Sequence, residues 1–269
     1  MIRLPAVAGQ FYPASPRELS SLIHRFIKEN GDPEKVRVRA CLVPHAGYIY
    51  SGHVAAAVFS RIIFPKKIIV IGVRHQPYGE DLAIVSHGEW RTPLGDVSID
   101  RALALRLRAA CPEFQEDEEA HKREHSLEVE IPFLQAMQAQ FTFVPVAVGG
   151  TRFEELVRIG EGLAGVIAGG EEEILIVTSS DMNHYEEGSV TRRKDQRAIE
   201  SLLRLDAKGL YEVCRRERIS MCGLGPAIVT LSALRKLGAK NGELVKYATS
   251  GEISGDYDAV VGYAGIIFR

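Results

Sequence analysis

Short apolar runs alternate with helical patterns along the whole sequence. The runs that predict buried strands are Val36–Val43, Lys67–Gly72, Leu82–Ser86, Phe141–Val148, Glu173–Thr178, Glu243–Ala248 and Ala259–Phe268. Strands that alternate with helices form a mixed, largely parallel sheet with helices on both faces. No linker or change in composition divides the pattern. We therefore predict an α/β fold, a single-domain α/β/α sandwich that spans residues 1–269.

The helical patterns have recognisable boundaries. Ser15-Pro16-Arg17-Glu18 is a capping box with proline at the first helical position, and it predicts a helix to about Asn30. Asp100 is placed to cap a helix that ends near Ala110. Further segments are expected to be helical: His53–Ile63, Glu124–Leu134 with a bend at its proline, Phe153–Ile167, Thr191–Arg204, Ala207–Arg216 and a helix that ends at Leu237. The acidic stretch Gln115–Glu124 is expected to be exposed and mobile, and Gly88–Asp96 to be a loop or hairpin.

Composition excludes several classes of protein. A formal net charge of -2 gives no electrostatic reason to expect nucleic acid or an anionic membrane as a partner. The first residues lack the apolar core of a signal peptide, and no apolar run approaches the ~20 residues of a spanning helix. The cysteines contain no C-x-x-C pair, so we expect no structural disulfide and a cytoplasmic location. Nucleotide-binding glycine motifs are also absent.

Polar side chains follow three of the predicted buried strands. His45 comes after the first run, His75 after the second, and Asp181 with His184 after Glu173–Thr178. Ligands of open α/β sheets bind beyond the carboxyl ends of the strands. Imidazole is a ligand for iron, copper and zinc, and single ligands from separate strand ends suit an open catalytic site. This pattern predicts that His45 and His75 bind a metal ion.

Other residues leave more than one interpretation open. His125 and His184 either act near the metal, as acid, base or ligand support, or only satisfy buried backbone groups. Cys222 lies in a glycine-rich turn, where a lone cysteine is usually a small buried apolar side chain. The remaining histidines are expected at the surface or on helix faces: His24, His53, His87 and His121. The absence of a G-x-S-x-G motif weakens a serine-hydrolase interpretation.

Several motifs together resemble those of one known family. They are Arg3-Leu4-Pro5-Ala6-Val7-Ala8-Gly9-Gln10-Phe11-Tyr12-Pro13, Pro44-His45-Ala46-Gly47-Tyr48, Thr92-Pro93-Leu94-Gly95, Glu124-His125-Ser126-Leu127-Glu128, Ser179-Ser180-Asp181, Met221-Cys222-Gly223 and Val260-Val261-Gly262-Tyr263. This set, which extends over nearly the whole chain, is similar to the Memo family. The resemblance implies the fold of class III extradiol (LigB-like) dioxygenases, which are non-haem iron enzymes.

The same resemblance implies a site and possible partners. The metal ligands would be His45, His75 and Cys222, and the catalytic residues His184, Asp181 and His125 would line the same cleft. Fe(II) or copper would be the cofactor, with zinc also compatible. Bacterial and archaeal members are associated with AMMECR-type and radical-SAM proteins in the AmmeMemoRadiSam system. Extradiol enzymes use two histidines and a carboxylate, so a cysteine in the third position means that ring cleavage does not carry over.

We therefore expect a mononuclear iron or copper redox protein, an oxidoreductase acting on a small molecule or peptide bound in the metal cleft. In this interpretation His184 is the general base, and Asp181 orients it or a bound water. His125 faces substrate, and Glu128 is the candidate to hold its second ring nitrogen. Cys222 would be the cysteine most easily oxidised. Two alternatives remain: a non-catalytic metal- or peptide-binding partner protein, and a metal-assisted hydrolase.

Overall fold

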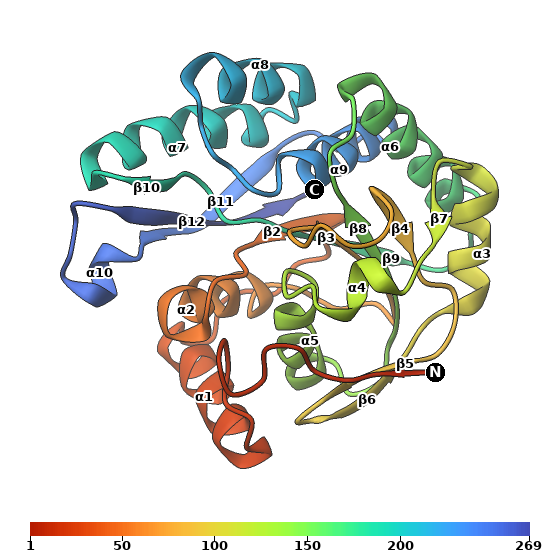
Figure 1. The fold of residues 1–269 in the computed structure, drawn as a ribbon, viewed down its shortest axis with the longest axis horizontal. Coiled ribbons are helices and arrows are strands. Elements are labelled where there is room, and N and C mark those ends of the chain that lie inside the picture. The colour runs from red at the N-terminus through yellow and green to blue at the C-terminus, as the bar shows by residue number, and fades with distance from the viewer.

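The apolar run Lys67–Val73 forms β3, near the middle of a nine-stranded sheet in the computed structural model, which describes residues 1–269 (Figure 1). Successive side chains of a strand point to opposite faces. Ile69 and Ile71 accordingly lie in one apolar core, whereas Ile68 and Val70 lie in the other. A strand that is buried on both sides requires a helical layer on each face of its sheet.

The sheet has a parallel centre and antiparallel flanks. Its order is β10-β12-β2-β9-β3-β8-β4-β7, with β11 paired to β12. Neighbours from β2 to β8 are parallel, whereas β12 and β4 run antiparallel to β2 and β8. The strands are β2 (Ala40–Val43), β3, β4 (Leu82–Ile84), β7 (Gln115–Glu116), β8 (Thr142–Val148), β9 (Ile174–Ser179), β10 (His184–Glu186), β11 (Gly242–Thr249) and β12 (Val260–Phe268). A small second sheet contains β1 (Ile2–Arg3), β5 (Glu89–Thr92) and β6 (Gly95–Ser98).

Two helical layers cover the large sheet. One contains α3 (Arg101–Ala110), α6 (Phe153–Ala168), α7 (Gly188–Leu203), α8 (Ala207–Glu217) and α9 (Leu224–Lys236). The other contains α1 (Pro16–Glu29), α2 (Tyr48–Phe59) and α5 (Ile131–Met137). Figure 1 shows α7, α8 and α9 above the sheet and α1, α2 and α5 below it. The predicted α/β sandwich is confirmed. Short helices α4 (Glu119–Lys122), η1 (Glu128–Glu130, a 3-10 helix) and α10 (Gly251–Ser254) lie in connections.

The predicted helix caps are confirmed. The Ser15 hydroxyl accepts a hydrogen bond from the Glu18 backbone N–H at 3.4 Å, and Pro16 is the first residue of α1. The Asp100 carboxylate accepts one from the Leu103 N–H at 3.0 Å at the start of α3. Each cap satisfies a backbone donor that the first helical turn leaves without a partner.

Some element boundaries differ from those predicted. The helix expected at His53 begins at Tyr48, because Gly47 serves as its N-cap directly after the histidine turn. Only Ala40–Val43 of the run that begins at Val36 forms a sheet strand, since Val36 makes just an isolated bridge to Ile62.

The prediction that Gln115–Glu124 is exposed is correct only in part. Gln115, Glu119, Lys122 and Arg123 are exposed, whereas His121 and Glu124 are 1% and 0% exposed. His121, which was expected at the surface or on a helix face, lies buried in α4. The predicted helix from Glu124 is also absent before η1, since the chain here forms turns that pack against the sheet. The charged residues of this stretch suggested exposure to solvent, because the sequence pattern does not show that the N-terminal segment packs against it.

Arg3 fastens the N-terminal segment to this stretch. Its guanidinium donates to the carbonyl oxygens of His121 and Glu124, at 2.9 and 2.7 Å, and lies 4.2 Å from the centre of the Trp90 ring. It also forms a 2.6 Å ion pair with the buried carboxylate of Glu128. Five donors in a rigid planar group suit arginine to this many acceptors at once.

Glu128 forms further hydrogen bonds to the N-terminal segment, beyond its ion pair with Arg3. Its carboxylate accepts hydrogen bonds from the backbone N–H groups of Ala6 and Val7, at 2.7 and 3.0 Å, and from the Tyr12 hydroxyl at 2.5 Å. Its oxygens are therefore committed to the N-terminal segment. The prediction that Glu128 holds a ring nitrogen of His125 was wrong for this reason.

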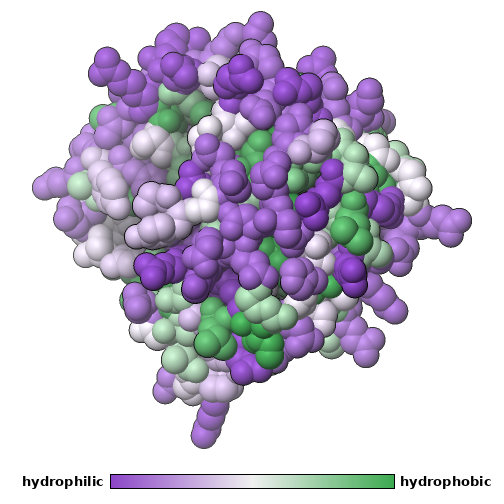
Figure 2. Space-filling view, turned by 45° about the vertical axis from the view of Figure 1, so that its right-hand side comes forward, coloured by the Kyte–Doolittle hydropathy of each residue, from purple (hydrophilic) through white to green (hydrophobic).

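The face of the molecule shown in Figure 2 is predominantly hydrophilic. Figure 2 shows apolar residues reaching one face of the molecule as small groups separated by polar and charged ones. None of the helices combines the length and the apolar character needed to cross a membrane.

We predict that Arg3→Ala lowers the free energy of unfolding by roughly 3–5 kcal/mol, because it leaves the buried Glu128 carboxylate without its positive partner. Urea unfolding followed by circular dichroism measures this change. Arg25→Ala is the control, since its ion pair with Glu29 is solvent-exposed and such pairs contribute little. Equal stabilities for the two variants would show that Arg3 does not fasten the N-terminal segment.

Candidate metal centre

Three neighbouring parallel strands place polar side chains at one edge of the sheet. β2, β9 and β3 are adjacent in that order, and they lead into His45, Asp181 and His75, respectively. Because parallel strands end at the same edge, these three residues are brought together by the topology alone. They line a cavity of about 520 Å³, which also includes His125, His184 and Cys222. All six residues predicted to form the site therefore reach one cavity.

His125 enters this cavity from the turn between α4 and η1. That turn packs so closely on β3 that a side chain at Gly72 would meet Ser126 Oγ at 2.6 Å and Leu127 at 2.8 Å. The glycine thus permits the close approach of the loop to the strand end. The His125 ring consequently stacks on that of His75, with 4.6 Å between ring centres and 21° between planes.

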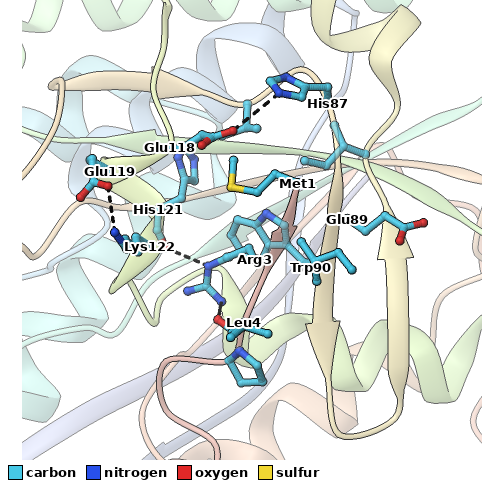
Figure 3. Close-up of a pocket in the computed structure, with 14 residues that line it drawn as sticks. Met1, Arg3, Leu4, His87, Glu89, Trp90, Glu118, Glu119, His121 and Lys122 are labelled. Carbon is cyan, nitrogen blue, oxygen red and sulfur yellow. Dashed lines mark hydrogen bonds and ion pairs between the residues drawn. The ribbon is translucent and has the colours of Figure 1, made fainter.

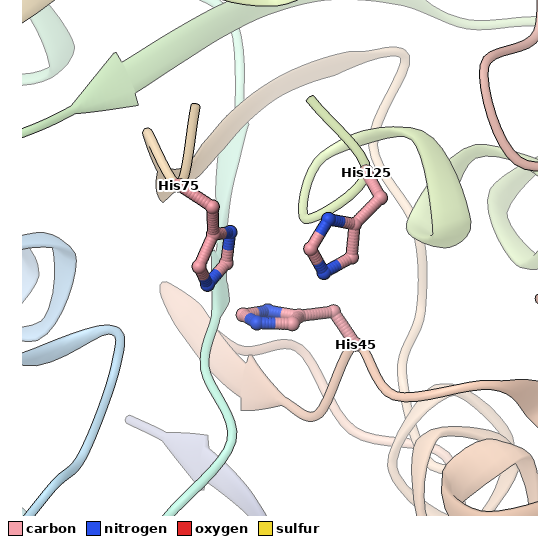
Figure 4. Close-up of side chains that lie close together, drawn as sticks. All are labelled: His45, His75 and His125. Atoms are coloured by element: carbon pink, nitrogen blue, oxygen red, sulfur yellow. The ribbon is translucent and has the colours of Figure 1, made fainter. Parts of the chain in front are cut away.

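The three imidazoles of His45, His75 and His125 form a compact cluster (Figure 4). One ring nitrogen from each lies within 4.8 Å of the others, so the cluster could hold a metal ion. The His45 ring is nearly perpendicular to the other two, with 5.2 Å to the centre of His75 and 5.4 Å to that of His125. Figure 4 shows the three rings pointing toward a common space from three separate segments of the chain.

Glu124 fixes the orientation of His75. Its carboxylate lies 2.9 Å from His75 Nδ1 and accepts the backbone N–H groups of His75, His125 and Ser126 at 2.6–3.0 Å. Burial raises the pKa of Glu124, but the hydrogen bond and charge of His75 and the charge of His125 outweigh it and lower that pKa to about 2. A carboxylate can only accept, so Nδ1 of His75 carries a proton, and in the neutral ring the lone pair lies on Nε2.

His45 is oriented by a hydroxyl. Its Nδ1 lies 2.8 Å from Ser179 Oγ, and that hydroxyl lies 2.9 Å from a carboxyl oxygen of Glu130. Burial, followed by the charges of His125 and His75, lowers the pKa of His45 well below its ordinary value. Burial likewise lowers the pKa of His125 to about 4. Both rings are therefore neutral near pH 7, which is the form that binds metal ions.

Cys222 lies beside the cluster. Its Sγ is 3.3 Å from His45 Nε2 and accepts the Asp181 N–H at 3.2 Å, but it is not among the three side chains within 4.8 Å of one another. Its turn is pressed against β9, where a side chain at Gly223 would meet Ser180 Cβ at 2.3 Å. Burial, then the charge of Asp181, raises the pKa of the Cys222 thiol. The thiol is thus protonated near neutral pH in the absence of a metal ion.

Asp181 and His184 complete the cavity wall. Asp181 Oδ1 accepts the backbone N–H groups of His45 and Ala46, at 2.8 and 3.3 Å, and burial raises its pKa to about 6. His184 Nδ1 lies 3.0 Å from the Ser220 carbonyl oxygen, which can only accept, so Nε2 is the ring nitrogen with a lone pair. The structure supplies no direct hydrogen bond between Asp181 and His184.

Two residues that sequence reasoning overlooked support the cluster, namely Glu124 and Ser179. Glu124 stood in a stretch that was expected to be exposed, although its position directly before His125 is a usable signal. Ser179 is the last residue of β9 and pairs with Val43 of β2, two residues before His45. This register could be inferred only once the strand order was known.

Comparisons with known proteins match the chain over its whole length. The model of the family described as "Memo-like protein" matches residues 3–267. A MEMO1 family protein of Methanopyrus kandleri is 40% identical over all of this chain and 99% of its own length. One from Aquifex aeolicus is 41% identical over 99% of each chain. The crystal structure of an uncharacterized Escherichia coli K12 protein is similar in fold, with a TM-score of 0.55 at 14% identity over 85% of this chain and 99% of that one.

The neutral, buried state of His125 predicts acid sensitivity of the metal-free protein. The ring binds a proton at about pH 6.5 when unfolded but only near pH 4 when folded, so its contribution to stability is complete above pH 6.5 and is lost as pH falls toward 4. We expect His125→Asn to reduce the slope of unfolding free energy against pH in this window, by up to about 1.4 kcal/mol per pH unit. Urea unfolding of both proteins between pH 7 and pH 4 measures it. Parallel curves would contradict a neutral buried ring.

Proposed function

The chain belongs to the Memo family, and we propose that it is a metal-dependent oxidoreductase that holds one iron or copper ion with His45, His75 and His125. The observation that supports this proposal is the convergence of three imidazoles from three chain segments. Two of them have Nδ1 engaged by Ser179 or Glu124, which leaves Nε2 as the nitrogen that can bind a metal.

The chemistry of these donors fits the proposed ion. Neutral imidazoles suit iron, copper and zinc, and histidine ligands usually donate their second ring N–H to a carboxylate or another polar group. The Cys222 thiol, 3.3 Å from His45 Nε2, could add a soft sulfur donor. Soft sulfur favours copper and iron over the hard ions magnesium and calcium. A bound iron or copper ion would supply one-electron redox chemistry in the cavity.

The surrounding residues have roles that the chain itself can perform. His184 can take a proton from substrate at Nε2, because its Nδ1–H is held by the Ser220 carbonyl. Asp181, whose pKa is about 6, can share a proton near neutral pH while its backbone contacts keep the His45 turn in place. Phe11, Tyr185 and Tyr263 supply aromatic walls against which an apolar part of a substrate can pack.

A zinc-dependent hydrolase is the second candidate. Three histidines are a known ligand set for catalytic zinc, which lowers the pKa of a bound water. In that case His184 would take a proton from water. The identity of the bound metal and the reaction separate the two candidates, while tight binding without turnover would favour a non-catalytic binding protein.

Metal analysis of histidine variants tests the proposed ligands. Protein purified without oxygen and reconstituted with Fe(II), Cu(I) or Zn(II) should hold one metal ion per chain. His45→Ala, His75→Ala and His125→Ala should each lose it, and Glu124→Gln should weaken binding roughly 10–100-fold by releasing His75. His184→Ala should keep the metal but lose oxygen uptake with substrate. Elemental analysis and an oxygen electrode provide the measurements.

Matched controls lie on exposed parts of the chain. His24→Ala, on α1, and Glu119→Gln, whose side chain pairs only with Lys122, should both retain wild-type metal content. Metal loss in His184→Ala equal to that in His45→Ala would make His184 a ligand. Full metal content in His125→Ala would remove His125 from the ligand set and restore the set of His45, His75 and Cys222.

We predict that Cys222→Ser weakens Cu(I) binding much more than Zn(II) binding, because a hydroxyl is a poor replacement for a thiolate toward a soft ion while the three imidazoles remain. Competition with a Cu(I) chelator measures the affinity. Thiol labelling after peroxide should modify Cys222 before Cys41, Cys111 and Cys214, which are buried. Wild-type Cu(I) affinity in the variant would show that Cys222 does not bind the ion.

A further inference from the structure

A second cavity, of about 360 Å³, lies beside β1 and the β5–β6 hairpin (Figure 3). It shares no lining residue with the cavity of the histidine cluster. Its volume falls within the range of about 300–1,000 Å³ that is typical of small-molecule sites.

His121 contributes a buried polar atom without a partner. Its Nδ1 lies 2.9 Å from the Asp117 carbonyl oxygen, which can only accept, so this nitrogen carries the proton. Its Nε2 is buried and has no hydrogen-bond partner. Burial lowers the pKa of His121 to about 4, so the ring is neutral and Nε2 is an unused acceptor. Buried acceptors are normally paired, and one that is not marks a place for a missing donor.

The remaining walls are mainly apolar. Ile2, Val85 and Ile99 line the cavity together with Trp90, whose ring is held between the Arg3 guanidinium and Phe143. Figure 3 shows Met1 beside His121 and Trp90. Met1 is 60% exposed, and a flexible thioether at a chain end can move aside for a ligand.

Most of the charged groups at the rim have charged partners within the protein. His87 Nε2 lies 3.6 Å from a Glu118 oxygen, and Lys122 forms a 3.1 Å ion pair with Glu119. Arg3 is neutralised by Glu128. Glu89 also lines the cavity; it forms no ion pair and accepts only the Ser98 hydroxyl, at 2.9 Å. The rim therefore offers no unpaired positive charge to an anionic ligand. The cavity combines apolar walls with one buried acceptor that has no partner.

We propose that this cavity is a second ligand site, which binds a neutral apolar molecule carrying one hydroxyl or N–H group that donates to His121 Nε2. The apolar body of the ligand lies against Ile2, Val85 and Trp90. Its donor satisfies the buried nitrogen. This site is separate from the histidine cluster and does not depend on the proposed metal chemistry.

Trp90 provides a direct readout, because it is the only tryptophan of the chain and lines the cavity. Borneol serves as the probe, and its methyl ether serves as the matched compound without a donor. Protein without a tag attached before Met1 is titrated with each, since Met1 and Ile2 line the cavity. We expect a saturable change in tryptophan fluorescence, with borneol bound about tenfold more tightly than the ether.

Two variants test the His121 acceptor and the apolar wall separately. His121→Asn keeps an N–H group near the position of Nδ1 but removes the Nε2 acceptor, so the preference for the alcohol should disappear. Ile2→Glu makes one exposed wall polar and should weaken both compounds equally. Thermal unfolding establishes that each variant is folded. If His121→Asn does not fold, the alcohol–ether comparison in the wild type still tests the hydrogen bond to the ligand, and Ile2→Glu still tests the location of the site.

The absence of any saturable fluorescence change with borneol in the wild type would overturn the proposal. Equal affinity of the alcohol and the ether in the wild type would show that His121 Nε2 does not accept a hydrogen bond from the ligand. A preference for the alcohol that persists in folded His121→Asn would do the same. Unchanged binding in Ile2→Glu would place the probe elsewhere.

Discussion

A single buried carboxylate holds the candidate metal centre together. Glu124 is 0% exposed, and its oxygens receive the His75 ring together with the backbone N–H groups of His75, His125 and Ser126. A buried carboxylate without hydrogen-bond partners would greatly lower the stability of the fold. The donors therefore stabilise the negative charge of Glu124, and the carboxylate in turn gives each buried donor a partner. Because the donors belong to β3 and to the loop before η1, the carboxylate also joins two segments that are distant in sequence.

The sheet topology supplies the other half of the site. Adjacent parallel strands bring His45, Asp181 and His75 to one edge of the sheet, where Asp181 also accepts the backbone N–H of His45. The strand ends alone would leave an open row of side chains. The loop that carries His125 covers this row because Gly72, which has no side chain, lets the loop approach β3. The turn that carries Cys222 also packs closely, because Gly223 has no side chain that would collide with Ser180. The site thus depends on close packing of loops as much as on strand order.

These two contributions explain what could be predicted from the sequence. Strand and helix patterns are local, so the α/β sandwich, the caps at Ser15 and Asp100, and the strand-end positions of His45 and His75 followed from them. The buried stretch that contains Glu124 and His121 is contacted at both backbone carbonyls by Arg3, more than a hundred residues away in sequence, and no local pattern encodes this contact. Charged residues were interpreted as solvated because a pattern of charges does not show which of them will meet a buried partner.

The same long-range contact also relates the two cavities. Arg3 lines the apolar cavity, and its guanidinium donates to the carbonyl oxygens of both His121 and Glu124. These carbonyls belong to the two ends of the short segment 121–124. His121, at its start, lines the apolar cavity, and Glu124, at its end, carries the carboxylate that holds His75. A displacement of Arg3 by a ligand would therefore act on the backbone that positions Glu124. The histidine cluster is consequently built on a segment whose position depends on contacts made outside its own cavity, and its geometry cannot be treated as independent of the N-terminal strand.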